Sequence, residues 1–193
     1  MSNTPEHSSP VYHDGMRELQ DRFDTRRLAD RLTERLLRTA FSEEDRAFIE
    51  GASFFFFATA DAAAQPDCSY KGGLPGFVRV TGESELSFPS YDGNGMFRSL
   101  GNLRVNPRVS LLFIDFEKPR RLRVIGSAAL TLEPVPAVRV RAEQIFPNCP
   151  RYIHRMKLLE HSAHAGDNPP VPAWKQMPHF NEVLPAADPA RRG

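Results

Sequence analysis

Apolar residues recur with a helical period near the start of the chain. Within residues 25–38, Leu28, Leu32 and Leu36 stand four positions apart, and charged residues fill most of the positions between them. Positions four apart share one face of an α-helix, so this spacing predicts an amphipathic helix. Residues 1–22 have no such period, and we expect that segment to be loosely ordered.

Two polar residues mark the start of a second helix. Ser42 is followed three positions later by Asp45, which resembles a capping box, and a glycine stands at position 51. In a capping box each side chain bonds the backbone N–H of the other residue at the helix start. We therefore expect a short helix that begins after Ser42 and that Gly51 ends.

Further along the chain, short segments with the composition or alternation of β-strands follow one another. The expected strands are Ser53–Ala60, Asp67–Tyr70, Phe77–Val80, Glu85–Phe88, Arg108–Phe116 and Arg121–Leu132. Six strands with one helix among them indicate an antiparallel barrel or sandwich. A doubly wound parallel sheet would need a helix after nearly every strand.

The helix among these strands is expected from Met96 to Val105, after a Gly-Asn-Gly turn at positions 93–95. The C-terminal part of the chain is rich in proline. There we expect helices at Ala137–Ile145 and Arg151–Ala165, followed by an extended or irregular tail.

A chain of 193 residues is of the usual size for one domain. We expect four parts within it. These are a loosely ordered N-terminal segment (1–22), a helical extension (23–51), a barrel core (52–133), and a helical, Pro-rich C-terminal segment packed on the barrel (134–193).

The composition of the chain limits the classes of function that we expect for it. Lys and Arg total 25 and Asp and Glu total 24, a formal net charge of +1, which argues against a protein that binds nucleic acid through a basic field. Two cysteines, Cys68 and Cys149, suit a reducing compartment. The first fifteen residues lack the pattern of a secretory signal, and the run Phe54–Ala58 is too short for a membrane helix. We therefore expect a cytoplasmic protein that neither spans a membrane nor binds nucleic acid.

One segment with candidate chemistry is Tyr91–Asn102, where a turn leads into a helix that carries Arg98 and Ser99 near its start. A helix N-terminus presents free N–H groups and the positive end of the helix dipole, which suits a phosphate. Taken alone, the segment favours an ordinary strand–turn–helix with an exposed arginine, because short motifs often match by chance.

Arg121 and Arg123 form a second candidate. Strand alternation places both on one face, where two guanidinium groups repel unless an anion or carboxylates lie between them. Spacing alone supports two explanations equally: an anionic ligand, or pairing with Asp115 and Glu117 on the preceding strand.

The third candidate is Cys68–Gly73, where Lys71 precedes two glycines at the end of a strand. Lys71 has the charge to neutralise an anion, and the glycines would let a flat ligand approach the backbone. Taken alone, this segment favours a strand end with a solvated lysine.

Together the three segments resemble the pyridoxamine 5′-phosphate oxidase-like family, the split barrels that bind flavin mononucleotide (FMN). The matching stretches lie between about Phe54 and Leu132, and they are FFFFATADAAAQPDCSYKGGLPGFVRV, LSFPSYDGNGMFRSLGNLRVNPRVSLLFIDF and RRLRVIG. They look closest to the branch described as predicted flavin-nucleotide-binding proteins. The resemblance implies a mainly β fold with flanking helices, built on an antiparallel six-stranded split β-barrel. It also implies a homodimer with two FMN molecules between the subunits.

By resemblance, Arg98 and Ser99 occupy the positions of an Arg-Lys pair that binds the FMN phosphate. Ser69 stands at the position of another phosphate-binding Arg, and Arg121 where the oxidases often have Gln. The serines remove positive charge, which Lys71 and Arg121 would partly restore. The cofactor-binding residues that the resemblance implies are Ser69, Lys71, Phe88, Pro89, Asn94, Arg98, Ser99, Asn102 and Arg121.

The C-terminal end, PAWKQMPHFNEVLPAADPARRG, lacks the family's R-L-H-type motif for the vitamin phosphate. This departure argues against true pyridoxamine phosphate oxidase activity. The segment Ile145–Tyr152 and Trp174 are candidates to cover the flavin, although packing alone explains them as well. Cys149, just before a predicted helix, is expected to have a lowered thiol pKa and a structural role.

Three histidines, His154, His161 and His164, fall within one predicted helix. Only His161 and His164 would be close enough to share a metal, and two ligands without a neighbouring cysteine or carboxylate make a weak site. We expect solvated histidines and no metal site.

The leading hypothesis is an FMN-dependent oxidoreductase that acts on a small molecule, with NADH, NADPH or oxygen as its second redox partner. No catalytic residue is assigned, since the flavin carries the redox step. No G-x-G-x-x-G fingerprint is present, so a nicotinamide would bind only transiently. Three alternatives stay open: a flavin-binding carrier or sensor without turnover, a haem-binding barrel, and a barrel that binds the deazaflavin F420.

Overall fold

The computed structural model describes residues 11–166 and 168–191. The chain forms two compact units, one that ends at Arg38 and one that begins at Thr39. The helix that begins after Ser42 therefore belongs to the same unit as the sheet.

The first unit holds two helices, α1 (Asp14–Arg22) and α2 (Arg26–Leu36). Arg17 bonds Asp30 across them at 2.7 Å. The predicted amphipathic helix is confirmed as α2. Helix α1 lies in the segment that we expected to be loosely ordered; an acidic residue in its first turn and a basic one in its last complement the helix dipole. Residues 1–10 of that segment lie outside the described residues.

Helix α3 (Glu43–Gly51) opens the second unit with the predicted capping box. The backbone N–H of Asp45 donates to Ser42 Oγ at 3.1 Å, and the backbone N–H of Ser42 donates to the Asp45 carboxylate at 3.0 Å. The helix buries Ile49 completely in the core of the sheet.

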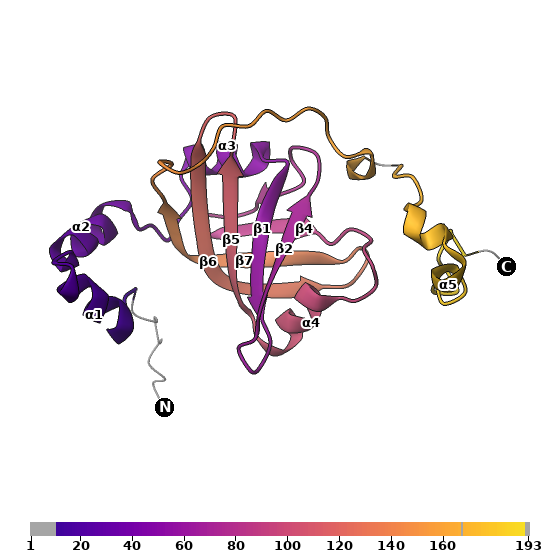
Figure 1. The fold of residues 1–193 in the computed structure, drawn as a ribbon, viewed down its shortest axis with the longest axis horizontal. Coiled ribbons are helices and arrows are strands. Elements are labelled where there is room, and N and C mark those ends of the chain that lie inside the picture. Colours follow the sequence, from indigo (N-terminus) through magenta and orange to yellow (C-terminus); the bar gives the residue numbers. More distant parts are fainter. Residues whose placement is uncertain (1–10, 167, 192–193) are drawn as a thin grey trace. The chain divides into compact units, whose positions relative to one another are not determined.

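A seven-stranded antiparallel sheet forms the body of this unit (Figure 1). Its strands are β1 (Phe54–Ala60), β2 (Pro66–Gly72), β3 (Arg79–Val80), β4 (Glu85–Pro89), β5 (Arg108–Asp115), β6 (Arg120–Thr131) and β7 (Ala137–Pro147). They are ordered β2-β1-β5-β6-β7-β4-β3. The predicted fold class is confirmed: the protein is a mainly β, antiparallel split barrel with flanking helices, with seven strands where six were expected.

The seventh strand, β7, replaces the helix predicted at Ala137–Ile145, and that prediction was wrong. Val138, Val140 and Ala142 are buried, whereas the residues between them are exposed. This alternation has the period of a strand. Strand β7 pairs with β6 on one side and with β4 on the other, so it joins the two halves of the sheet.

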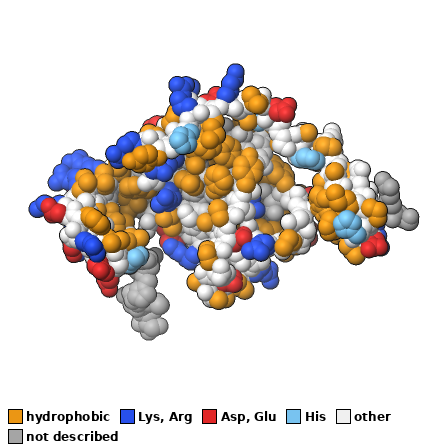
Figure 2. Space-filling model, in the orientation of Figure 1, with side chains coloured by type: hydrophobic (Ala, Val, Ile, Leu, Met, Phe, Trp, Pro, Cys, Tyr) orange, Lys and Arg blue, Asp and Glu red, His pale blue; other side chains and the backbone are white. Residues whose placement is uncertain are grey.

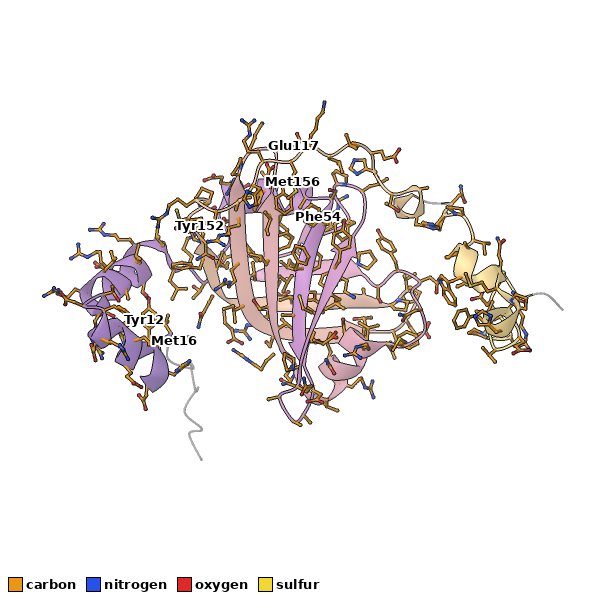
Figure 3. The ribbon with its side chains drawn as sticks, in the orientation of Figure 1. Tyr12, Met16, Phe54, Glu117, Tyr152 and Met156 are labelled. Carbon is orange, nitrogen blue, oxygen red and sulfur yellow. The ribbon has the colours of Figure 1, made fainter. Side chains whose placement is uncertain are left out.

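The helix predicted at Arg151–Ala165 was also wrong. Among the described residues of that segment only the short 3₁₀ turn η1 (Ala163–Ala165) is helical. The backbone N–H of Met156 donates to the carbonyl of Phe116, and that of Leu158 donates to the Glu117 carboxylate, both at 3.0 Å. The middle of the segment therefore bonds the β5–β6 turn, and Figure 3 shows Met156 beside Glu117 at that end of the strands.

The remaining helical elements are α4 (Arg98–Val105), η2 (Ala173–Gln176) and α5 (Pro178–Asn181). Helix α4 confirms the helix expected among the strands, although it begins two residues later. It packs on β1 and β6 and buries Leu100 and Leu103 in the core.

Strand alternation gives the sheet two different faces. Phe55 and Phe57 of β1 are fully buried in an aromatic core, where the Phe55 ring lies 4.9 Å from that of Phe88. Phe54 and Phe56 lie on the opposite, partly exposed side, which we call the outer face. Its larger side chains, by their register on β1, β2, β5 and β6, include those of Phe54, Phe56, Tyr70, Leu112, Ile114, Arg121, Arg123 and Ile125. Figure 2 shows hydrophobic side chains gathered over the sheet.

Gly126 occupies the bulge where the register between β6 and β7 shifts. A Cβ at this position would lie 2.0 Å from the carbonyl oxygen of Arg141, which is backbone and cannot move aside cheaply. We expect Gly126→Ala to lower the free energy of unfolding, measured by urea denaturation, by at least about 2 kcal/mol.

Gly101→Ala is the matched control, because a Cβ on Gly101 in α4 meets nothing within 4 Å. Alanine is the better helix former, so this variant should gain about 0.5–1 kcal/mol. Equal stability of the two variants would contradict the close approach of β6 and β7 at the bulge.

Candidate functional site

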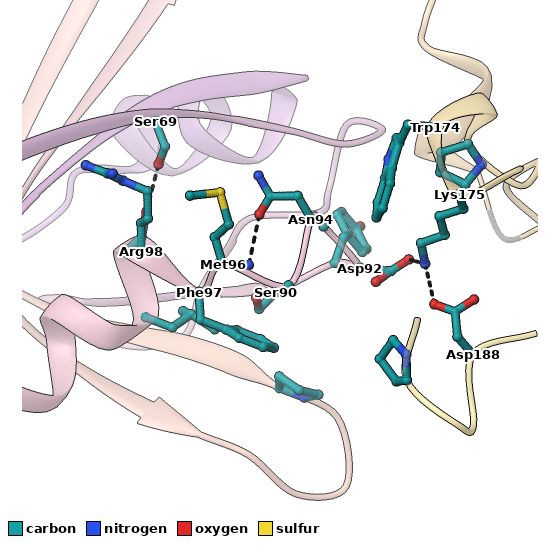
Figure 4. A pocket seen from close by; sticks show the side chains of 18 of the residues that line it. Ser69, Ser90, Asp92, Asn94, Met96, Phe97, Arg98, Trp174, Lys175 and Asp188 are labelled. Atoms are coloured by element: carbon teal, nitrogen blue, oxygen red, sulfur yellow. Dashed lines mark hydrogen bonds and ion pairs between the residues drawn. The ribbon is translucent and has the colours of Figure 1, made fainter. Parts of the chain in front are cut away.

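A large pocket of about 1190 Å³ opens beside the start of α4 (Figure 4). The lining comes from the second unit: residues 67–69 and 71 of β2, residues 90–100 of the loop and first turn of α4, Pro136, and part of residues 172–188. The pocket is at the upper end of the volumes typical of ligand sites and is large enough for a nucleotide-sized ligand.

The first turn of α4 faces this pocket without a side-chain cap. Its N-cap residue, Phe97, has a left-handed backbone (φ 49°) and gives no capping hydrogen bond. A left-handed conformation costs a residue with a side chain about 1–2 kcal/mol. The first N–H groups of a helix need an outside acceptor, and the helix dipole makes an anion the favoured one.

Two hydroxyl groups meet beside this helix start. Ser69 Oγ of β2 and Ser99 Oγ of α4 lie 3.0 Å apart, and only 5% of the Ser99 surface is exposed. Both residues line the pocket. The sequence placed Ser69 and Ser99 among the cofactor-binding residues, and the fold brings them together from positions thirty residues apart.

Arg98 stands at the first position of α4 and lines the same part of the pocket. Its Nε donates to the Asp67 carboxylate at 3.1 Å, and 64% of the Arg98 side chain is exposed. Exposed ion pairs contribute little to stability. An anion that binds Arg98 with better geometry could therefore replace Asp67 as its partner at little cost in free energy.

Lys71 adds a second positive charge from the end of β2. Its side chain is half-buried, and this loss of solvent lowers the pKa of Lys71, although the negative charge of Asp67 opposes the shift. In the described part of the chain, no carboxylate lies within ion-pairing distance of Lys71. A lysine in this environment favours an anionic ligand, because the anion would stabilise its charged form.

Of the remaining predicted cofactor-binding residues, some line the pocket and others do not. Asn94 lines the pocket, where its side-chain oxygen accepts the backbone N–H of Met96. Phe88 is buried in the core and Pro89 pairs with Ala137 at the end of β4, so neither is among the residues that line the pocket. Asn102 is also absent from the lining, and its side-chain amide donates to Thr59 Oγ at 2.9 Å.

Arg121 lies on the other side of the sheet from Lys71. Lys71 pairs with the buried Phe55, whereas Arg121 pairs with Ile114 of the outer face. Residues that pair directly across an antiparallel ladder share a face. One copy of the chain therefore does not bring Arg121 to the pocket that holds Lys71.

The expected carboxylate partners do not lie across from the two outer-face arginines. Arg121 pairs with Ile114 and Arg123 with Leu112, while Asp115 pairs with Arg120. The Nε of Arg121 is buried without a hydrogen-bond partner among the described residues. Of the two explanations that spacing supported, pairing with Asp115 and Glu117 is not the one observed.

The far end of the pocket holds an ionic cluster, centred on a buried lysine, that the sequence did not suggest. Lys175 is 5% exposed, and its Nζ donates to the carboxylates of Asp92, at 2.5 Å, and Asp188, at 2.8 Å. The bond to Asp188, followed by that to Asp92, raises the pKa of Lys175. The bond to Lys175 in turn lowers the pKa of Asp188. These residues are far apart in sequence, so no local pattern reveals their association.

Trp174, a candidate cover in the sequence, does line this end of the pocket. Its ring meets that of Phe180 edge to face, with 5.9 Å between the centroids. Figure 4 shows Trp174 and Lys175 across the pocket from Asn94, Met96 and Phe97. The C-terminal segment therefore forms one wall of the pocket.

The histidines and Cys149 lie outside the pocket lining. The described residues contain no group of three or more side chains able to hold a metal ion. Hydrogen bonds from the backbone and side chain of Arg151 lower the pKa of the exposed Cys149 thiol. The lowered pKa of Cys149 agrees with the expectation, but Arg151 lowers it and not the start of a helix. Within the described residues no helix is long and apolar enough to cross a membrane.

Comparison with known proteins identifies a family. The family model described as pyridoxamine 5′-phosphate oxidase matches residues 41–168. No curated protein matches the sequence.

Three solved structures illustrate the likeness in fold. HupZ of Group A Streptococcus is 16% identical, with 61% of this chain and 100% of that chain covered and a TM-score of 0.46. An FMN-binding protein of Syntrophomonas wolfei is 13% identical over 68% of this chain and 97% of its own (TM-score 0.45). HutZ, a haem storage protein of Vibrio cholerae, is 19% identical over 56% and 94% (TM-score 0.41).

Proposed function

The chain belongs to the pyridoxamine 5′-phosphate oxidase family, and we propose that it binds FMN and passes electrons between this cofactor and a small molecule. One observation carries the proposal. The uncapped first turn of α4, the Ser69–Ser99 hydroxyl pair and the cations Arg98 and Lys71 all border one pocket. This set of donors fits a phosphate group.

Each residue has a role that follows from its position. The N–H groups at the start of α4 and the two serine hydroxyls would donate hydrogen bonds to phosphate oxygens. Arg98 would add a charge-assisted bond in exchange for its exposed contact with Asp67. Lys71 would supply the charge that the serines lack. FMN, when bound, would supply the ring that accepts and donates electrons.

We also propose that the protein is a homodimer in which a second copy covers the outer face. That face is largely apolar, and the ring of Phe54 stacks between those of Tyr70 and Phe116, at 5.4 and 5.9 Å. Arg121 lies on the same face, and its buried Nε has no hydrogen-bond partner in the described part of the chain. Because Arg121 cannot reach the pocket of its own copy, a role toward FMN would place it in the pocket of the second copy.

The test of the cofactor is the affinity of purified protein for FMN and for riboflavin, which lacks the phosphate. We expect Arg98→Ala to weaken FMN binding by about ten- to a hundredfold, the worth of a charge-assisted hydrogen bond, and to leave riboflavin binding unchanged. Arg104→Ala, at the other end of α4, is the matched control. Equal effects of the two variants, or a bound chromophore identified as haem or F420, would contradict FMN binding at α4.

Turnover separates an oxidoreductase from a flavin-binding carrier or sensor. We expect NADH or NADPH, mixed with the FMN-loaded protein in a stopped-flow instrument, to bleach the flavin absorbance band, and oxygen to restore it. The rate of bleaching should rise with the nicotinamide concentration and level off. Failure of both nicotinamides to reduce the flavin would favour the carrier or sensor.

The dimer is tested at Phe56, in the middle of the outer face. Phe56→Glu would bury an unpaired charge between the copies, and we expect the dissociation constant, measured by analytical ultracentrifugation, to rise at least about thirtyfold. Leu159→Glu is the control, because Leu159 is 91% exposed. A wild-type protein that sediments as a monomer would refute the proposal.

A further inference from the structure

The pocket has two chemically different ends. The α4 end carries the phosphate-binding groups described above. The other end is built from the C-terminal segment, and we call it the C-terminal end. The side chains that form it are those of Pro172, Trp174, Phe180, Val183, Leu184 and Pro185.

The apolar surface at the C-terminal end is open. Phe180 is 42% and Val183 73% exposed, although both line the pocket. The edge-to-face contact with Phe180 orients the Trp174 ring, and the Lys175 ammonium lies 5.8 Å from the centre of that ring. An oriented indole beside exposed apolar side chains favours a flat apolar ligand.

Charge excludes a second phosphate at this end. The cation there, Lys175, is already bonded to the two carboxylates of Asp92 and Asp188, so the cluster is net negative. Asp92 is 74% exposed at the pocket. A phosphorylated molecule would meet a negative field with no free positive group among the described residues at this end, and its desolvation would go uncompensated.

We propose that the C-terminal end is the substrate subsite, that it takes a flat, uncharged apolar molecule in preference to a phosphorylated one, and that Trp174 determines this specificity. The proposal rests on the proposed function, in which FMN occupies the α4 end. It extends that function by naming the class of substrate.

The geometry also explains how the C-terminal segment is held in place for this role. Lys175 is bonded to Asp92 in the loop before α4 and to Asp188 further along its own segment. The Asn181 side chain donates to the carbonyls of Lys175 and Ala190, at 2.8 and 2.7 Å. The segment is thereby closed on itself and fixed to the loop that leads to the phosphate-binding helix.

Two probes with the same ring test the proposal: 2-naphthol, which is uncharged, and 2-naphthyl phosphate. Each is titrated calorimetrically into the full-length protein saturated with FMN. We expect 2-naphthol to bind at one site at least about tenfold more tightly than its phosphate ester. Trp174 is the only tryptophan of the chain, so 2-naphthol should also quench the protein fluorescence with the same dissociation constant.

Variants at Trp174 and Val183 test which residues set the preference for 2-naphthol over its phosphate ester. Trp174→Ala should weaken 2-naphthol binding about tenfold, whereas Trp174→Phe, which keeps a flat ring, should stay within about threefold of the wild type. Val183→Lys places a free cation at an exposed position and should strengthen binding of 2-naphthyl phosphate by about fivefold or more. This gain does not depend on how well Trp174→Ala folds.

The outcomes separate this proposal from the function on which it rests. Equal affinity for the two probes, or unchanged 2-naphthol binding in Trp174→Ala, would overturn the substrate subsite. Arg98→Ala should weaken FMN binding and leave 2-naphthol binding unchanged. If the protein does not bind FMN while 2-naphthol still binds at Trp174, the proposed function fails and the apolar subsite stands.

Discussion

The alternation of side chains across the sheet decides which residues meet in this protein. Successive residues of a strand point to opposite faces, so the run of phenylalanines in β1 divides into core residues and outer-face residues. The same alternation in β2, read through its register with β1, turns Ser69 and Lys71 toward the side on which α4 packs. In β6 it turns Arg121 to the other side. A site that used Lys71 and Arg121 together would therefore need two copies of the chain.

Electrostatics at the start of α4 makes this side of the sheet suitable for an anion. The helix begins at a left-handed residue without a side-chain cap, and Lys71 is held where loss of solvent disfavours its charge. Each feature costs free energy in the protein alone, and a phosphate would relieve both. The start of α4, the Ser69–Ser99 hydroxyl pair and the two cations therefore suit the phosphate that the proposed function places there.

The C-terminal segment forms the apolar end of the pocket. A buried lysine shared by two carboxylates fixes the segment to the loop before α4. Lys175 is the only cation among the described residues that line this end of the pocket, and both carboxylates compete with a ligand for it. Removal of both carboxylates would leave the charge of the buried Lys175 uncompensated. The interaction that fixes the C-terminal segment thus also leaves a net negative cluster beside the apolar side chains of this end.

Features that arise from neighbouring residues could be predicted from the amino-acid sequence. The capping box of Ser42, the strands β1 to β6, the presence of a helix that ends at Val105 and the family could all be predicted, because turn chemistry, periodicity and motif spacing are local. The alternation of Val138 and Val140 was also present in the sequence, but the short segment was mistaken for a helix. Tertiary structure alone decided that Phe88 packs in the core, that Arg121 faces away from the pocket, and that Lys175 joins Asp92 to Asp188. These outcomes depend on strand register and on contacts between distant segments, and such contacts produce no periodic pattern in the sequence.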